Sequence, residues 1–291
     1  MPWYLYSLLA AGLVSLVSIF EKKILSRDEH AMEYATTLSI LALVVSLPFF
    51  LVIDYSAISG RVLIILGGIA IVGGTAFLLI AKAVKHMEVS SVSPLLVLAP
   101  GLTALLAYPI LGEKLSSQQI LGLVLLLVGA FVLELKPHHK LSVIWADLKR
   151  QRYLPLILVA IVLYTFTALA DRFVLSRYHL EPLTYLVFIN LFLALYFIIT
   201  SAIWHDGLRG VRHSLKTAGL PIFLVAVLVV GHRWALINAV GLAFIGLAVA
   251  VKRSSSLFTT ILGGEIFHEH NILRKSLACV IMLVGVVLVA I

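Results

Sequence analysis

A short charged stretch occurs twice in this chain. Residues 20–27 read Phe-Glu-Lys-Lys-Ile-Leu-Ser-Arg, and residues 170–177, 150 positions later, read Ala-Asp-Arg-Phe-Val-Leu-Ser-Arg. Each copy follows a long apolar run, so an acidic-basic pair stands at the same depth in both, Glu21-Lys22 in the first and Asp171-Arg172 in the second. A duplicated apolar domain with matched internal charges is typical of proteins that move polar solutes across a membrane.

The composition of the chain points to lipid as its solvent. Hydrophobic residues make up 62% of the 291 residues and charged residues 12%, against about 45–50% and 25% in soluble domains. A water-soluble fold could not cover that much apolar surface. The single cysteine excludes a disulfide framework and a thiolate metal cluster. We interpret the net charge of +8 as a sign of orientation in the membrane, not of nucleic-acid binding.

Apolar runs long enough to cross a bilayer recur along the chain. A helix that spans about 30 Å of hydrocarbon needs about 20 apolar residues. The sequence predicts ten such helices, at 3–25, 33–53, 61–83, 89–111, 117–135, 154–176, 183–204, 216–236, 240–262 and 272–291. We therefore expect an all-α membrane protein with ten transmembrane helices.

The longest polar stretch, Lys136 to Arg152, divides these helices into two groups of five. We expect a first repeat over residues 1–136, a polar or amphipathic linker over 137–152, and a second repeat over 153–291. Because five is an odd number, the second repeat enters the membrane inverted relative to the first. In transporters, inverted repeats of this kind place the substrate site near the membrane midplane, between the halves.

Basic residues are distributed unequally between the two predicted faces. The face with both termini carries Arg61, Lys114 and Arg177. The other face carries a much larger set: Arg27, Lys85, Lys136, Lys140, Lys149, Arg150, Arg152, Arg209, Arg212, Lys216, Arg274 and Lys275. By the positive-inside rule the second face is cytoplasmic, which predicts a multi-pass protein of the cell membrane with both termini outside.

Charged residues inside the predicted helices are the first candidates for a site. Each costs about 2.5–3.5 kcal/mol at a helix centre, and persists where it is paired or faces a wet cavity. Lys252-Arg253 lies in the middle of the predicted helix 240–262, too deep to reach either surface easily. Two interpretations stay open: an ion pair with Asp171 or Glu21, and a cationic anchor for substrate. Arg233 stands about one turn before the predicted helix end, where it could also reach the interface.

Small polar residues mark one helix face that we expect to line a cavity. Ser15, Ser18 and Lys22 share a face of the first helix, because they are spaced i, i+3 and i+7. Thr165 and Arg172 occupy the matching places in the second copy. The alternative for the hydroxyl groups is a hydrogen bond within their own helix.

Helix-breaking residues mark a second face of the expected cavity. Pro94 and Pro100 stand inside the predicted fourth helix, and proline bends a helix because it removes a backbone donor. Gly246 takes the position of Pro94 in the matching ninth helix. We expect these three residues to shape the cavity, in ways that differ between the halves.

The ends of the two halves also match. Gly112-Glu113 aligns with Gly264-Glu265, and each pair precedes a helix with small residues seven positions apart: Gly122 and Gly129, then Ala278 and Gly285. Small residues at this spacing let another helix approach closely. Packing within the protein and packing in a homodimer would both use them, so monomer and homodimer stay open.

No catalytic or metal-binding constellation stands out in the sequence. His268-Glu269-His270 is a weak metal candidate, because ligands two positions apart on a helix point to different sides. Motifs of metalloproteases, serine hydrolases and nucleotide-binding folds are absent from the sequence. We therefore expect no enzyme activity, no cofactor and no metal. The expected partners are a small-molecule substrate and the lipid bilayer, without nucleic acid.

Several segments of the first half resemble the EamA repeat of the drug/metabolite transporter superfamily. They are Val89 to Pro94, Ala99-Pro100, Thr103 to Ala107, Leu111 to Ser116 and Gly122 to Gly129. The second half resembles the partner repeat through Lys252 to Phe258 and Gly264-Glu265. The resemblance implies two inverted five-helix repeats, alternating access and no ATPase part. It also implies cytoplasmic termini, opposite to the charge count.

Lys252-Arg253 is also similar to the lysine-arginine step in the ninth helix of the sugar-phosphate and nucleotide-sugar branch, where those residues hold substrate phosphate. The sequence thus predicts a secondary transporter for a small anionic or zwitterionic metabolite, driven by protons or by exchange. The expected substrate-binding residues are Lys252, Arg253, Arg172, Lys22, Ser15, Ser18 and Thr165. Glu21 and Asp171 are expected to serve in coupling or gating. A lipid-phosphate flippase and an exporter of amino acids or drugs are the alternatives.

Overall fold

The computed structural model describes residues 1–25, 31–56, 58–86, 95–134, 152–205, 207–259 and 272–290. Its helices are α1 (Trp3–Leu25), α2 (Ala31–Ser46), the short 3-10 helix η1 (Leu47–Leu51), α3 (Gly60–His86), α5 (Leu98–Leu111), α6 (Ser117–Glu134), α8 (Leu154–Arg177), α9 (Pro182–Trp204), α10 (Leu208–Leu242), α11 (Ile245–Lys252) and α13 (Ile272–Ala290). No strand occurs among these residues, so the prediction of an all-helical protein is confirmed.

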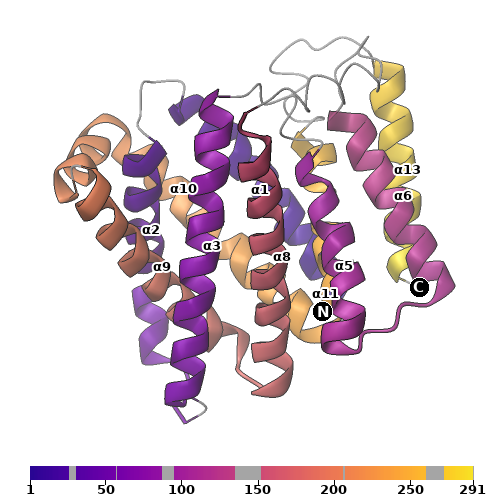
Figure 1. The fold of residues 1–291 in the computed structure, drawn as a ribbon, viewed down its shortest axis with the longest axis horizontal. Coiled ribbons are helices and arrows are strands. Elements are labelled where there is room, and N and C mark those ends of the chain that lie inside the picture. Colours follow the sequence, from indigo (N-terminus) through magenta and orange to yellow (C-terminus); the bar gives the residue numbers. More distant parts are fainter. Residues whose placement is uncertain are drawn as a thin grey trace.

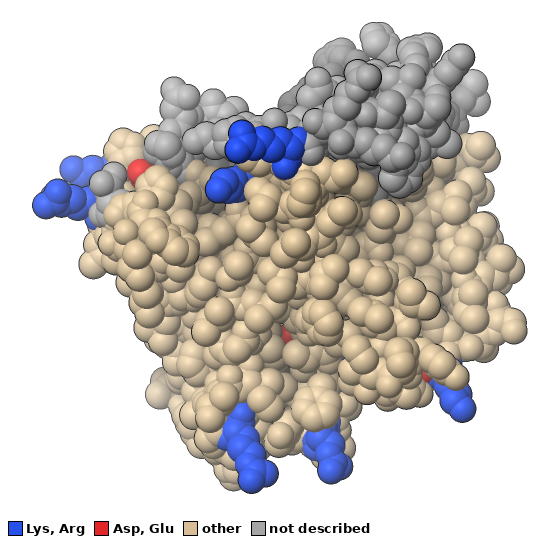
Figure 2. Space-filling model, viewed as in Figure 1, with Lys and Arg blue, Asp and Glu red and all other residues tan. Residues whose placement is uncertain are grey.

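Six of the described helical segments are long and apolar enough to cross a membrane: α1, α2 with η1, α3, α8, α9 and α10. α5, α6 and α13 are shorter apolar helices. Lys and Arg side chains gather toward the two ends of the bundle, and the band between them is almost uncharged (Figure 2). This is the surface expected of a multi-pass membrane protein.

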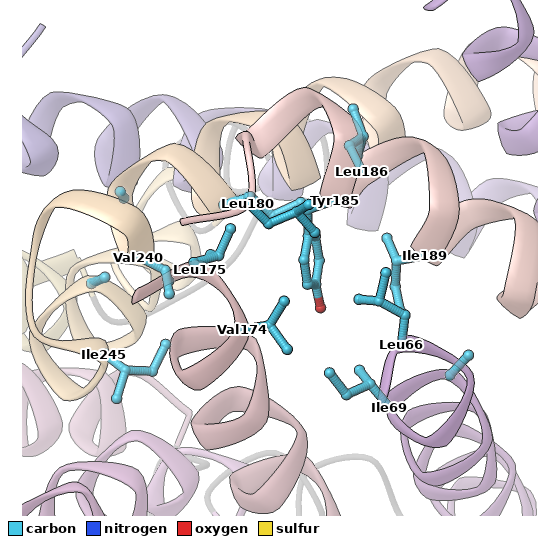
Figure 3. Close-up of a cluster of buried hydrophobic side chains, with 14 of the residues drawn as sticks. Leu66, Ile69, Val174, Leu175, Leu180, Tyr185, Leu186, Ile189, Val240 and Ile245 are labelled. Atoms are coloured by element: carbon cyan, nitrogen blue, oxygen red, sulfur yellow. The ribbon is translucent and has the colours of Figure 1, made fainter. Parts of the chain in front are cut away.

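The helices form one bundle, and α8, α9, α10 and α11 are its central helices, because each contacts several others. α1 packs along α10, α2 packs on α9 and α10, and α3 packs on α8 and α9. α5 contacts α8 and α11, and α6 with α13 forms a pair at one side of the bundle (Figure 1). An extensive apolar cluster joins the central helices through residues that include Leu66, Val174, Tyr185, Val240 and Ile245 (Figure 3).

α10 is longer than predicted at both ends. It begins at Leu208, not at residue 216, and it bends at Ala218, whose φ is −143° and ψ is 27°. The bend precedes Pro221, which removes an amide donor and crowds the preceding turn. The helix continues through Asn238, which lies between the predicted helices 216–236 and 240–262. The Asn238 side chain bonds the Trp234 carbonyl of its own helix, so it does not end the helix.

The predicted helix 240–262 is wrong in its boundaries. Residues 240–242 belong to α10, and α11 runs only from Ile245 to Lys252. Arg253 and Ser254 form a turn, and a helical segment follows at 255–259. Lys252 thus stands at a helix end and not in the middle of a helix. In the predicted fourth helix, residues 89–94 lie outside the described part of the chain.

The two stripes of small residues pack against each other within the chain. A Cβ atom on Gly122 would lie 2.8 Å from the carbonyl oxygen of Gly285, and one on Gly129 would lie 2.9 Å from that of Ala278. Hydrogen in place of a side chain therefore lets the backbones of α6 and α13 come into direct contact. Of the two uses open from the sequence, the structure has packing within the protein.

Candidate functional site

Lys252 lies at a break between helical segments. α11 has eight residues and ends at Lys252, and the chain turns at Arg253. Broken helices are tolerated at membrane depth where they line a cavity or are buried in protein. Such breaks also form the substrate sites of many transporters. Within the described residues the Lys252 ammonium has neither a hydrogen bond nor an ion pair, although it interacts electrostatically with Asp171, Arg253 and Arg233.

Asp171 lies among these cations. It sits on α8, interacts electrostatically with Lys252 of α11 and Arg233 of α10, and accepts a hydrogen bond from the Tyr185 hydroxyl of α9. The three charged side chains are deep in the bundle, yet each keeps part of its surface accessible. An acidic side chain is visible through the uncharged middle of the face drawn in Figure 2.

Glu21 has the same kind of partner as Asp171. It accepts a hydrogen bond of 3.0 Å from the Tyr34 hydroxyl of α2. In each half, then, a carboxylate on the first helix is bonded by a tyrosine on the next. Tyr34 and Tyr185 are 151 positions apart, close to the 150 that separate Glu21 from Asp171. The sequence interpretation missed both tyrosines, and their matching offset is the signal that could have found them.

Arg233 joins this site through Asn190. Its guanidinium donates a hydrogen bond of 2.5 Å to the Asn190 side-chain oxygen on α9. The Asn190 amide nitrogen in turn donates to the Ser46 hydroxyl at 2.8 Å. Tyr164 of α8 interacts electrostatically with both Arg233 and Glu21, which connects the two carboxylate regions. The sequence left open that Arg233 reaches the interface, because the helix was predicted to end at residue 236; in the structure α10 continues to Leu242.

Arg172 makes its contacts at the far end of α8. Its Nε donates to Glu113 at 3.0 Å in an ion pair, and its Nη1 donates to the carbonyls of Val240 and Gly241 at 2.7 and 3.0 Å. The other Glu113 oxygen accepts from the amide of Ile245 at 3.0 Å. Arg172 and Glu113 thus tie together the ends of α5, α8, α10 and α11. The role of Arg172 in substrate binding stays a prediction.

Gly112 brings Glu113 to this place. It ends α5 with a φ of 72°, a left-handed conformation that residues with a side chain rarely adopt. The chain turns sharply there, and the buried Glu113 reaches back to α8 and α11. The sequence interpretation noted Glu113 only as a repeat marker. The matching Gly264-Glu265 pair lies outside the described residues.

The remaining predicted site residues are dispersed. Arg253 donates a hydrogen bond to the Leu96 carbonyl, at the start of the α5 region. Pro100 is buried on α5. Gly246 lies against Ala104 of α5, where a Cβ atom would come 2.7 Å from the Ala104 Cα. Gly246 therefore allows α11 and α5 to approach closely.

The hydroxyl groups predicted to line a cavity differ in their hydrogen bonding. Ser15 and Ser18 donate to the carbonyls of Gly12 and Val14 in their own helix, at 2.7 and 3.0 Å. Thr165 is fully buried, and its hydroxyl has no partner within the described chain. The Lys22 side chain, Pro94 and the His268–His270 segment lie outside the described residues. Elsewhere in the described chain, no group of three or more His, Cys, Asp or Glu could hold a metal ion.

Comparison with known proteins gives a family match for the first half. The model of the EamA-like transporter family matches residues 1–135. A solved crystal structure of a protein has a TM-score of 0.72, and the match covers 99% of this chain and 96% of that one, at 15% sequence identity. At that identity the likeness is one of fold alone. No curated protein matches the sequence closely enough to count as a relative.

Proposed function

We propose that this chain, whose residues 1–135 match the model of the EamA-like transporter family of the drug/metabolite transporter superfamily, is a secondary transporter for a small anionic or zwitterionic metabolite. The family implies a membrane transporter of the drug/metabolite type. The proposal adds the substrate class, an alternating-access mechanism, and coupling to protons or to a counter-substrate.

The observation that carries the substrate class is the position of Lys252. Lys252 stands at a helix break inside the bundle, without a hydrogen-bond or ion-pair partner in the described chain. Burying its charge costs free energy that no such partner offsets, which indicates that the lysine has a function. Its neighbour Asp171 is already bonded by Tyr185. A substrate carboxylate or phosphate would complete the coordination of the Lys252 ammonium, which has three donors.

The proposed architecture has ten transmembrane helices in two inverted repeats, residues 1–136 and 153–291, joined by a linker at 137–152. The recurrence of the carboxylate–tyrosine pair supports it, because Glu21–Tyr34 and Asp171–Tyr185 involve corresponding helices of the two halves. Both chain ends lie toward the end of the bundle that holds the α5–α6 connection (Figure 1). On the positive-inside count this end faces outward.

Coupling is assigned to the two tyrosine-bonded carboxylates. Glu21→Gln and Asp171→Asn keep the size of each side chain and one acceptor oxygen for its tyrosine, but remove its charge and its titration. We expect each change to alter transport driven by a pH gradient in proteoliposomes. If both variants respond to the gradient as the wild type does, the proton role is lost and an exchange mechanism remains.

A ligand screen tests the function itself. Purified protein is heated with small carboxylates, phosphate esters and zwitterions, and compounds that raise the unfolding temperature are then tested for flux into proteoliposomes. A compound that both stabilises and is transported supports the proposal. Stabilisation and competition by lipid-linked phosphate, without flux of any soluble compound, would contradict it and favour a flippase.

A further inference from the structure

We infer that Arg233, held in place by Asn190, is a second oxyanion-binding residue of the transport site, together with Lys252. This inference rests on the proposed function and extends it. The Arg233 guanidinium would bind the substrate carboxylate or phosphate through two hydrogen bonds, and Lys252 would add a point charge.

The position of Arg233 in α10 excludes an interfacial role. Arg233 stands nine residues before the helix end at Leu242, about 13 Å along the axis at 1.5 Å per residue. In the other direction the membrane-crossing part of α10 extends back to the bend at Ala218, which is farther away. An arginine side chain cannot bring its charge to the interface over these distances and still bond Asn190 inside the bundle.

The partner of Arg233 is neutral. Its one hydrogen bond within the described chain is to the Asn190 amide oxygen, and a guanidinium carries five N–H donors. Asp171 interacts with Arg233 electrostatically but accepts its hydrogen bond from Tyr185. Most of the Arg233 donors therefore have no partner within the described chain, deep in a protein where unbonded donors are costly.

A buried chain of hydrogen bonds fixes the orientation of this partner. The Ser46 hydroxyl donates a hydrogen bond to the Ala42 carbonyl at 2.8 Å, so its oxygen can accept the hydrogen bond from the Asn190 amide nitrogen. The amide oxygen is then left facing Arg233. Asn190 and Ser46 are 1% and 0% exposed. Three helices thus hold one guanidinium in place, which is the arrangement expected of a binding residue supported by a second layer.

The chemistry of the two cations specifies the ligand class. Guanidinium is planar and binds carboxylate or phosphate through two parallel hydrogen bonds, whereas an ammonium acts as a point charge. Lys252 and Arg233 both interact electrostatically with the single carboxylate of Asp171. The local excess of positive charge fits a small solute with one oxyanion group, either a carboxylate or a phosphate ester.

The substitution Asn190→Asp distinguishes a substrate-binding role of Arg233 from a purely structural one. The change is nearly isosteric and gives Arg233 an ionic partner inside the protein. If Arg233 is structural, the new ion pair leaves ligand binding intact. If Arg233 binds substrate, the new carboxylate occupies its donors. Asn238→Asp is the matched control, because Asn238 lies on α10 as Arg233 does, is partly exposed, and its side chain bonds the Trp234 carbonyl of its own helix.

The probes are butyrate and glycerol 3-phosphate, with sodium chloride at equal ionic strength as blank, and the readout is the unfolding temperature. We expect at least one probe to stabilise the wild type and Asn238→Asp. In Asn190→Asp the half-saturating concentration should rise by about tenfold or more, as expected for one charge-assisted contact. Arg233→Lys, which keeps the charge but not the planar fork, should behave like Asn190→Asp. The responding probe tells carboxylate from phosphate.

Other outcomes separate the two claims. If Lys252→Ala loses probe binding while Asn190→Asp and Arg233→Lys keep it, the transport site stands and the role of Arg233 is overturned. If neither probe stabilises the wild type, the oxyanion substrate class fails, and the role of Arg233 fails with it.

Discussion

Individual charged side chains in this bundle are held by partners from other helices. The sequence anticipates this, because neighbours such as Asp171 and Arg172 point to different sides of one helix. Arg172 is bonded by Glu113 and by two carbonyls of α10. Asp171 is bonded by Tyr185. Which helix supplies each partner depends on three-dimensional packing, so the sequence alone could not name Glu113 or Tyr185.

Removing the charge of Glu113 should destabilise the protein strongly. Glu113→Gln keeps an acceptor for the Ile245 amide but leaves Arg172 without its counter-ion, at side-chain exposures of 17% for Arg172 and 6% for Glu113. We expect a loss of about 3 kcal/mol in the free energy of unfolding, as for one broken buried ion pair. Denaturant unfolding in detergent measures it.

The double variant Glu113→Gln/Arg172→Gln provides the control for this ion pair. It should recover part of the loss, because no uncompensated charge remains. Lys114→Gln, an exposed neighbour, should change stability by less than about 0.5 kcal/mol. Strict additivity of the two single changes would show that the ion pair makes no net contribution.

The two tyrosines should have equivalent roles in the two halves. Tyr34→Phe and Tyr185→Phe each remove a buried hydroxyl donor, at 2% exposure in both cases, and leave a carboxylate oxygen unbonded. We expect each to lower the free energy of unfolding by about 1–3 kcal/mol. Tyr108→Phe, at 60% exposure, should have almost no effect. Losses confined to one half would argue against a repeated carboxylate–tyrosine pair.

The lengths of apolar runs predicted several helices correctly, but the positions of helix breaks could not be predicted from the sequence. Apolar runs predicted the helices near 3–25, 154–176 and 183–204, and the structure has α1, α8 and α9 there. Asn238 falls between the predicted helices 216–236 and 240–262 but is helical, and its side chain bonds its own helix. The end of α11 at Lys252 has no signal in composition. Because of these two boundary errors, Arg233 was predicted to lie near a helix end and Lys252 in the middle of a helix.

Close packing of α6 on α13 makes glycine necessary at a specific position. Gly122→Ala would place a Cβ atom 2.8 Å from the Gly285 carbonyl oxygen, which belongs to the backbone and cannot move aside alone. We expect the helix pair to separate and the unfolding temperature to fall, with an overpacking cost of about 1–3 kcal/mol. Gly68→Ala in α3 is the control, because no atom lies within 4 Å of its Cβ position. Equal stability of the two variants would contradict the contact.

For the whole molecule, the repeated charged stretch indicated duplication, and composition indicated a membrane. Both follow from the chain alone, because each rests on counting residues. The constellation of Asp171, Lys252 and Arg233 could be predicted only in part. Two of its members were named as site residues, but the third requires knowing which face of α10 meets α9. Its neutral partner Asn190 carries no charge to draw attention in the sequence.

The inverted-repeat architecture predicts where the chain ends lie. Five helices per half place the N-terminus and the C-terminus on one face and the linker at 137–152 on the opposite face. Epitope tags at both termini should show the same accessibility in intact cells, and a tag inserted in the linker the opposite accessibility. By the charge count the termini are the outward side. Termini on opposite sides would rule out ten crossings.

Flux in proteoliposomes containing Lys252→Ala decides whether Lys252 is an anchor for substrate. Lys252 is the cation at the end of α11, where the helix breaks. With a compound that the wild type transports, we expect Lys252→Ala to fold, to retain its unfolding temperature to within a few degrees, and to lose uptake and exchange. Lys114→Ala, a change at an exposed lysine, should transport as the wild type does. Full transport activity of Lys252→Ala would show that Lys252 does not anchor the substrate.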